Sequence, residues 1–316
     1  MSITQRIDAI THIPDTHRGR VLPRPRSVKV ELTAACDFKC FFCATSHNLR
    51  KKGHMNMRLF MRIAKEMREA GVEELGLFYL GESFLYKHLT EAVRYAKEEC
   101  GFPYVFLTAN GHAATPAKIE AVMQAGLDSL KWSFNWGDAG QCREVTGVDA
   151  FHSVVETIKS AWVIREQVLA KTGHKCRLYA SSIKYDGAQQ KRMESAVKEI
   201  RPFVDEHYWL PLYNQAGLVS EVEAEKGLNP SAGNMGRIGG LVAPLPCWAL
   251  FTEGHVSWDG VLTGCCFSHT PDFDFGDLKE MGFMEAWNSI HAQKLRGAHL
   301  GLDVTGTPCE TCAAYQ

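Results

Sequence analysis

Three cysteines within one short stretch are the part of this chain best suited to bind a metal. They are Cys36, Cys40 and Cys43, spaced C-x3-C-x2-C. Three thiolates at this spacing can hold three irons of a four-iron cluster, and the fourth iron is then left without a protein ligand. An incomplete zinc site with His47 or His54 as the fourth ligand is the alternative, although this spacing is uncommon for structural zinc.

A second group of cysteines lies near the C-terminus, where four of them follow the spacing C-x17-C-x43-C-x2-C. The four are Cys247, Cys265, Cys309 and Cys312. Four thiolates can saturate a 4Fe–4S cluster, so this site would offer no open iron. By spacing alone a zinc ribbon is an alternative. The adjacent Cys266 is left over, either as a spare neighbour or as the ligand in place of Cys265.

The composition indicates a cytoplasmic protein. The 316 residues include 11 cysteines, an odd number, and in a reducing cytosol cysteines serve metals or catalysis more often than disulfides. Charged residues make up 22% and the formal net charge is -1, so we expect no nucleic-acid partner. The chain has no apolar run of the roughly 18 residues that span a bilayer, and its N-terminus lacks the apolar segment of a signal peptide. We therefore expect no membrane partner.

Short β-rich segments alternate with amphipathic helical segments through most of the chain. The predicted strands cover residues 27–33, 75–80, 104–108, 130–134, 177–183 and 207–212, and the predicted helices cover 59–70, 89–99, 116–124, 151–169 and 190–201. This alternation indicates an α/β fold with a parallel sheet. Right-handed crossovers curve such a sheet toward a barrel, and six units fall short of the eight that close one. We therefore predict a partial barrel.

Changes in the pattern divide the chain into four parts. Residues 1–26 are a polar arm that ends in a Pro-rich stretch, and residues 27–215 form the partial barrel. Residues 216–246 are dense in glycine and proline, which indicates a linker or long loop. Residues 247–316 carry the second group of cysteines and form a small α+β domain. In this domain Asp259-Gly260 is a hairpin-turn dipeptide between β-like runs.

The first cysteine motif, with the aromatic Phe42 directly before its last cysteine, resembles that of the radical SAM superfamily. The resemblance implies that S-adenosylmethionine (SAM) binds the open iron through its amino and carboxylate groups. It also implies that a reduced cluster splits SAM into methionine and a 5′-deoxyadenosyl radical, which takes hydrogen from a C–H bond. The family's fold, an open (β/α)6 barrel, agrees with the number of units. A flavodoxin- or ferredoxin-type protein is the implied electron donor.

Polar residues follow the predicted strands at their carboxyl ends, where ligands bind in α/β folds. The run Tyr79-Leu80-Gly81-Glu82-Ser83 resembles the family's Gly-Gly-Glu motif, with Leu80 in place of one glycine. The resemblance implies that Glu82 balances the SAM ammonium and that Ser133 contacts its carboxylate or ribose. Outside this family, a glutamate after a strand is usually a solvated loop residue or a helix cap. The predicted cofactor-binding residues are Phe42, Gly81, Glu82, Thr108, Asn110, Ser133, Asn135 and Ser182.

The C-terminal region resembles the twitch domain, the shortened relative of the SPASM domain. The resemblance lies in the turn 258–260, the run 275–278, the run 286–288 and the closing cysteine pair. A full SPASM domain, with two auxiliary clusters, needs more cysteines than the five present here. The resemblance therefore implies one auxiliary 4Fe–4S cluster held by four cysteines, as in the 2-deoxy-scyllo-inosamine dehydrogenases. The implied cofactors are SAM and two 4Fe–4S clusters.

An auxiliary cluster with no open iron can accept an electron but cannot bind substrate. We therefore predict that a secondary alcohol of a sugar or aminocyclitol is oxidised to a ketone. Two other enzymatic reactions stay open: radical epimerisation of a sugar or peptide residue, and modification of a ribosomally made peptide. A non-enzymatic electron carrier or a structural zinc protein is the alternative from another class. The predicted catalytic residues are Cys266, as the hydrogen donor of an epimerase, and Arg237, Tyr213 and His207, which orient the substrate.

Overall fold

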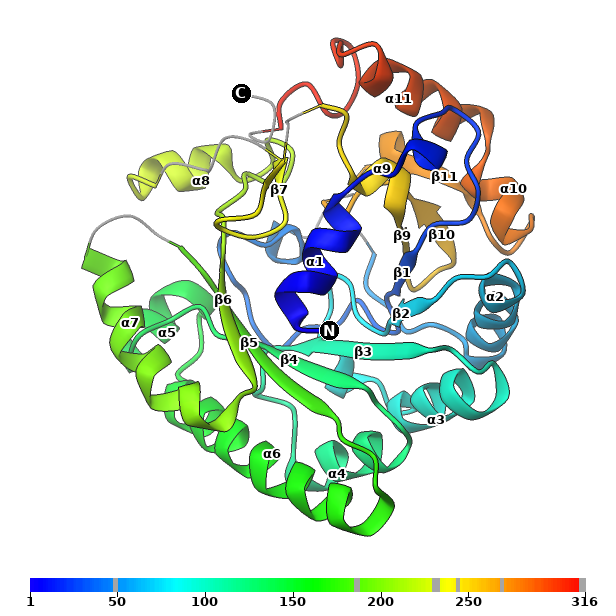
Figure 1. The fold of residues 1–316 in the computed structure, drawn as a ribbon. Helices are drawn as coiled ribbons and strands as arrows, with labels where there is room; N and C mark the ends of the chain where they lie inside the picture. Colours follow the sequence, from blue (N-terminus) through cyan, green and yellow to red (C-terminus); the bar gives the residue numbers. More distant parts are fainter. Residues whose placement is uncertain (48–50, 185–187, 229–233, 243–244, 268–269, 313–316) are drawn as a thin grey trace.

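Among the residues that the structure describes, nine strands form one sheet in the order β11-β10-β9-β1-β2-β3-β4-β5-β6 (Figure 1). The computed structural model describes residues 1–47, 51–184, 188–228, 234–242, 245–267 and 270–312. Six parallel strands follow one another in sequence order and curve around a common interior. They are β1 (Ser27–Val30), β2 (Glu74–Gly76), β3 (Tyr104–Ala109), β4 (Ser129–Ser133), β5 (Arg177–Ile183) and β6 (Glu206–Leu210). The predicted α/β fold with an open (β/α)6 barrel is confirmed.

Helices cover the outer face of these strands (Figure 1). They are α2 (Met57–Glu69), α3 (Leu89–Arg94), α4 (Pro116–Gln124), α5 (Ala139–Thr146), α6 (Phe151–Thr172) and α7 (Ala188–Ile200). Two of these helices begin directly after a capping residue. The side chains of Asn56 and Thr115 accept backbone N–H groups from the first turns of α2 and α4. The short α5 was not predicted. Strand β2 ends at Gly76 rather than at Leu80, because the following residues form the loop that packs against the first cysteine motif.

The C-terminal region extends the same sheet. Strand β9 pairs in parallel with β1, and β10 and β11 follow as antiparallel strands, with the predicted turn Asp259-Gly260 between β9 and β10. The strands are β9 (Glu253–Val256), β10 (Val261–Thr263) and β11 (Asp274–Asp277), and the helices are α9 (Ala249–Thr252), α10 (Phe283–Trp287) and α11 (Ile290–Leu300). The second group of cysteines is therefore built onto an edge of the barrel sheet.

The segment 216–246 is not wholly a loop. Its described residues include the short helix α8 (Ser220–Glu225) and a pair of strands, β7 (Asn234–Met235) and β8 (Leu241–Val242). Residues 229–233 and 243–244 of the predicted linker, and residues 313–316 of the predicted C-terminal domain, lie outside the described residues. Within the described ranges, no helix combines the length and the apolar character that a membrane crossing requires.

The N-terminal arm contains a helix, α1 (Ile3–Thr11), which lies across the barrel interior (Figure 1). Ser2 and Gln5 form a capping box at its start, a signal that was present in the sequence. Arg6 pairs with Glu74 at 2.9 Å, and the Thr4 hydroxyl donates to Glu206 at 2.6 Å. Since these carboxylates belong to the first residues of β2 and β6, α1 covers the end of the barrel opposite to the cysteine loop.

Arg237 anchors this helix, so the prediction that it orients the substrate is wrong. Its Nε donates to Oδ1 of Asp8 at 2.9 Å and its Nη2 to Oδ2 at 2.7 Å. The remaining Nη1 donates to the Ile238 carbonyl at 3.3 Å. A guanidinium that binds a carboxylate through two parallel hydrogen bonds is fixed in orientation. Every nitrogen of Arg237 is therefore engaged by α1 or by its own loop.

We expect Arg237→Met and Asp8→Asn to destabilise the fold, and the double variant to lose less than the sum. The pair is partly exposed, so a coupling free energy of about 0.5–1 kcal/mol is expected. A double-mutant cycle from urea unfolding measures it. Strictly additive effects would show that the pair does not hold α1.

Candidate active site

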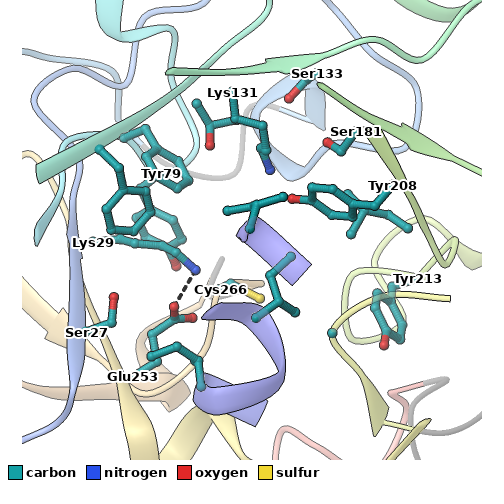
Figure 2. Close-up of a pocket in the computed structure, with 18 of the residues that line it drawn as sticks. Ser27, Lys29, Tyr79, Lys131, Ser133, Ser181, Tyr208, Tyr213, Glu253 and Cys266 are labelled. Atoms are coloured by element: carbon teal, nitrogen blue, oxygen red, sulfur yellow. Dashed lines mark ion pairs between the residues drawn. The ribbon is translucent and has the colours of Figure 1, made fainter. Parts of the chain in front are cut away.

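Alternate side chains of the parallel strands face the barrel interior, because successive residues of a strand point to opposite faces of a sheet. On β4, Ser129, Lys131 and Ser133 line the interior, while the buried Leu130 and Trp132 point the other way. The cavity that these strands enclose has a volume of about 430 Å³. Figure 2 shows polar side chains entering it from several walls. The barrel is therefore a pocket rather than a packed apolar core.

The loop that carries the first three cysteines begins where β1 ends. The Lys39 N–H donates to the carbonyl of Thr146 in α5 at 2.8 Å, and Nδ2 of Asn110 donates to Asp37 at 2.7 Å. These contacts fix the loop from two sides of the barrel rim, the end at which the parallel strands have their carboxyl ends. Cys43 lines the cavity, so a group bound by the loop would face the barrel interior.

Burial raises the pKa of each thiol in this loop. That of Cys36 rises to about 12, and those of Cys40 and Cys43 also lie above the usual value. Without a metal the thiols are therefore protonated at neutral pH, and metal binding must displace the protons. The three thiols are soft donors of the kind that iron–sulfur clusters require.

The structure also bears on the zinc alternative. His47 bonds to the Phe41 carbonyl at 3.1 Å, and Nδ1 of His54 bonds to the Thr33 hydroxyl at 2.8 Å. In the described part of the chain, no three His, Cys, Asp or Glu side chains are already gathered around a single metal ion. A four-iron cluster binds each cysteine at a different iron, so its ligands need not meet at one point. The donor set thus fits a cluster.

Gly81 and Glu82 hold the loop after β2 against the cysteine loop. A Cβ atom at Gly81 would lie 1.9 Å from the Thr33 carbonyl oxygen, so this approach requires glycine. Glu82 is 3% exposed, and its carboxylate accepts backbone N–H groups from Asn110 at 2.7 Å and Phe84 at 3.1 Å. Burial raises its pKa to about 7 despite these hydrogen bonds. Glu82 and Asn110 therefore lie beside the cysteine loop rather than on the cavity wall.

Four of the predicted cofactor-binding residues line the cavity together. They are Phe42, Thr108, Ser133 and Asn135, from the cysteine loop and the carboxyl ends of β3 and β4. The side-chain oxygen of Asn135 accepts the Ile183 N–H at 2.9 Å, which fixes its amide. The chain thus brings an aromatic ring and three polar side chains to one rim, next to the cysteines. Their roles in cofactor binding stay predictions.

Ser182 and His207 point out of the barrel, so the predictions that they bind cofactor and substrate are wrong. The Ser182 hydroxyl donates to the Phe134 carbonyl and contacts Nε2 of His207 at 3.0 Å. Burial, with Arg201 nearby, lowers the pKa of His207 to about 4, so the imidazole is neutral. Their strand neighbours Ser181 and Tyr208 line the cavity instead, because the pleat turns alternate residues inward.

Sequence reasoning missed the charged residues of the interior. Lys29 on β1, Lys131 on β4 and Glu253 on β9 all line the cavity (Figure 2). Nζ of Lys29 lies 2.6 Å from the Glu253 carboxylate. Burial opposes the ionisation of Glu253, but Lys29 and His255 outweigh it and lower its pKa to about 2. The available signal was a lysine within a short β-rich run, as at Lys29 and Lys131.

The second group of cysteines lines a smaller cavity of about 60 Å³. Cys247, Cys265, Cys309 and Cys312, the four predicted ligands, all contribute to its wall, together with Cys266. Backbone contacts orient two of them: the Cys247 N–H donates to Nδ1 of His299 at 3.1 Å, and Cys265 Sγ accepts the Phe267 N–H at 3.3 Å. Four soft donors around one enclosed space fit a fully ligated cluster.

The two cavities share a wall. Four residues line both cavities: Tyr213, Trp248, Cys266 and Phe267. Cys265, in contrast, lines the smaller cavity but not the barrel cavity. Cys266 lies among the residues of the barrel cavity in Figure 2. This division favours Cys265 as the cluster ligand. It also leaves Tyr213 and Cys266 as the predicted catalytic residues that reach the barrel cavity.

Comparison with known proteins identifies two regions. The family model of the radical SAM superfamily matches residues 30–161, and that of an iron–sulfur cluster-binding domain (SPASM) matches residues 247–313. Curated relatives include the probable GTP 3′,8-cyclases of Saccharolobus solfataricus, 33% identical, and Sulfurisphaera tokodaii, 31% identical, each over 134 residues. These matches cover 42% of this chain and 42% of each relative, so the chain spans less than half the length of these relatives.

Solved structures of similar fold cover most of the chain. BtrN in complex with AdoMet and 2-DOIA has a TM-score of 0.59 at 14% identity and covers 91% of this chain and 92% of its own. Streptococcus suis SuiB bound to the precursor peptide SuiA has a TM-score of 0.65 at 16% identity and covers 93% and 71%. Native anSMEcpe with bound AdoMet has a TM-score of 0.61 at 14% identity and covers 86% and 83%. At these identities the likeness is one of fold.

We expect Gly81→Ala to disrupt the first cysteine site, because the new methyl group collides with backbone rather than with a movable side chain. Iron in the reconstituted protein should fall from about eight to about four atoms per chain. Gly282→Ala is the matched control, since a Cβ there meets nothing within 4 Å. Full iron content in Gly81→Ala would contradict this account of the loop.

Substitutions of the two adjacent cysteines, Cys265 and Cys266, should have different effects on the iron content. Cys265→Ser should lose the second cluster, leaving about four irons, whereas Cys266→Ser should keep about eight. The reason is that Cys265 lines only the smaller cavity, whereas Cys266 also lines the barrel cavity. The opposite pattern would make Cys266 the ligand.

Proposed function

Because the chain belongs to the radical SAM superfamily, we propose that it oxidises a secondary alcohol of a small molecule to a ketone. The substrate would lose a hydrogen atom from carbon, a proton from the hydroxyl group and one electron. The cofactors are SAM and 4Fe–4S clusters. When bound, they supply a 5′-deoxyadenosyl radical that takes the hydrogen atom and an auxiliary acceptor for the electron. We propose a flavodoxin- or ferredoxin-type protein as the external donor.

The shared wall between the two cavities carries this proposal. A substrate in the barrel would be separated from the second group of cysteines by Tyr213, Trp248, Cys266 and Phe267. An electron leaving the substrate would therefore cross a single layer of side chains. Five cysteines line the smaller cavity, which is enough to supply all four ligands of a cluster. A cluster there would have no open iron and would serve electron transfer rather than substrate binding.

The chain's own residues would position the reactants. We propose that Thr108, Ser133 and Asn135 hold the polar groups of SAM at the rim and that Phe42 lies beside its adenine. Tyr213, on the shared wall, would orient the substrate hydroxyl. Helix α1 covers the opposite end of the barrel, so reactants would enter beside the cysteine loop. Placement of the reacting carbon near the rim is the main contribution that a protein makes to such a reaction.

Epimerisation is the second candidate, because Cys266 lines the barrel cavity. A thiol there can return a hydrogen atom to the opposite face of a substrate radical. The reaction then gives no ketone and transfers no electron to an acceptor. The resulting sulfur radical would have to be reduced before the next turnover.

The two reactions differ in product. We expect anaerobically reconstituted protein, with SAM, dithionite and the correct alcohol, to form one carbonyl per 5′-deoxyadenosine released. Cys266→Ser should retain this stoichiometry. Product with deuterium at carbon after reaction in D2O, dependent on Cys266, would instead establish epimerisation. Absence of 5′-deoxyadenosine, in a preparation that holds both clusters, would contradict both proposals.

A further inference from the structure

The positive and negative side chains that line the barrel cavity are not equal in number. Of the described residues that line it, three are cationic, Arg6, Lys29 and Lys131, and two are anionic, Glu74 and Glu253. Arg6 pairs with Glu74 at 2.9 Å, and Lys29 pairs with Glu253 at 2.6 Å. In the parts of the chain that the structure describes, Lys131 has neither an ion pair nor a hydrogen bond. It is the cation left over once the other charges have been paired.

Lys131 lies deep in the barrel. It is two residues before the rim residue Ser133 on β4, which places it roughly 6.6 Å below the rim at the usual rise of a strand. Figure 2 shows its amine directed into the cavity, and Nζ lies 5.9 Å from the centre of the Tyr208 ring. Burial and repulsion from Lys29 outweigh the attraction of Glu253, which is itself paired with Lys29, and lower the pKa of Lys131 to about 8. An ammonium without a countercharge is costly to bury, so an anion beside it would be stabilised.

We infer that the substrate carries an anionic oxygen group, a carboxylate or a phosphate, which pairs with Lys131 below the rim. The inference rests on the proposed function only in that the substrate occupies this cavity. It narrows the substrate to acidic molecules. A cationic aminocyclitol would add a further positive charge to a space where Lys29 and Arg6 already use their carboxylate partners, and like charges at short range repel.

The test measures occupancy at Lys131 directly. Anaerobically reconstituted protein with SAM bound is treated with an amine-acylating N-hydroxysuccinimide ester, and acylation of each lysine is followed by mass spectrometry. The probes are inorganic phosphate, acetate and the cationic aminocyclitol 2-deoxystreptamine. We expect phosphate or acetate to protect Lys131, with about a tenfold lower rate at about ten times its Kd, since few sites are then free. The exposed Lys198 on α7 should react at an unchanged rate.

The two anions distinguish the chemical source. Protection by phosphate alone assigns a phosphate group, and protection by acetate alone assigns a carboxylate. In calorimetric titrations with the protecting anion, Lys131→Met should lose the binding, because it keeps the length of the side chain without its charge. Lys131→Arg should retain binding, and Lys198→Met is the matched control that should bind as the parent does.

Three outcomes overturn the inference: neither anion protects Lys131, 2-deoxystreptamine protects it as well as the anions do, or Lys131→Met binds the anion as the parent does. None of these measurements involves turnover. Such a result therefore leaves the proposed oxidation standing. If instead Lys131 is protected but no acidic alcohol is converted to a ketone, the oxidation fails while the anionic subsite holds.

Discussion

The parallel pairing of β9 with β1 is the constraint on which the rest of the structure depends. Its register sets Glu253 opposite Ser27 and His255 opposite Lys29. The Glu253 carboxylate therefore reaches the Lys29 ammonium inside the barrel. Because β10 runs back along β9, the residues after β10 arrive beside the amino end of β1. The first group of cysteines follows the carboxyl end of β1, and the second group lies toward its amino end. Cys43 of the first and Cys266 beside the second both line the barrel cavity. Without this pairing they would belong to separate units.

Charge pairing explains how a barrel can keep so polar an interior. A buried charge is tolerated when a counter-charge and hydrogen bonds compensate for the loss of water. The Lys29–Glu253 pair provides this between β1 and β9, and Arg6 of α1 provides it for Glu74 on β2. Helix α1 thus neutralises a carboxylate at the amino end of the strands while it covers that end. The volume between this floor and the cysteine loop is what remains for reactants.

Several features could be predicted from the sequence because they depend on local order. The bounds of α4 and β5 are those predicted, since Pro and Gly mark the ends of α4 and β5 is a short β-rich run. Other predictions failed because the sequence does not show which residues of a strand face the barrel interior. In Ser181-Ser182 both residues are polar, so the pattern cannot tell which one faces inward. Arg237 pairs with Asp8, which lies 229 positions away in the sequence, and no local pattern reveals such a contact.

The sequence by itself determined the ligand chemistry, because the spacing of thiols along a loop limits the metal groups they can hold. It also determined the succession of strands and helices, which follows from hydrophobic periodicity. Only the tertiary structure decided which side chains face the barrel cavity, which cysteine of the adjacent pair also lines it, and which lysine of that cavity has no ion pair within the described ranges. The physical reason is that inward orientation and charge pairing depend on how distant strands align, and that alignment is set by packing of the whole sheet.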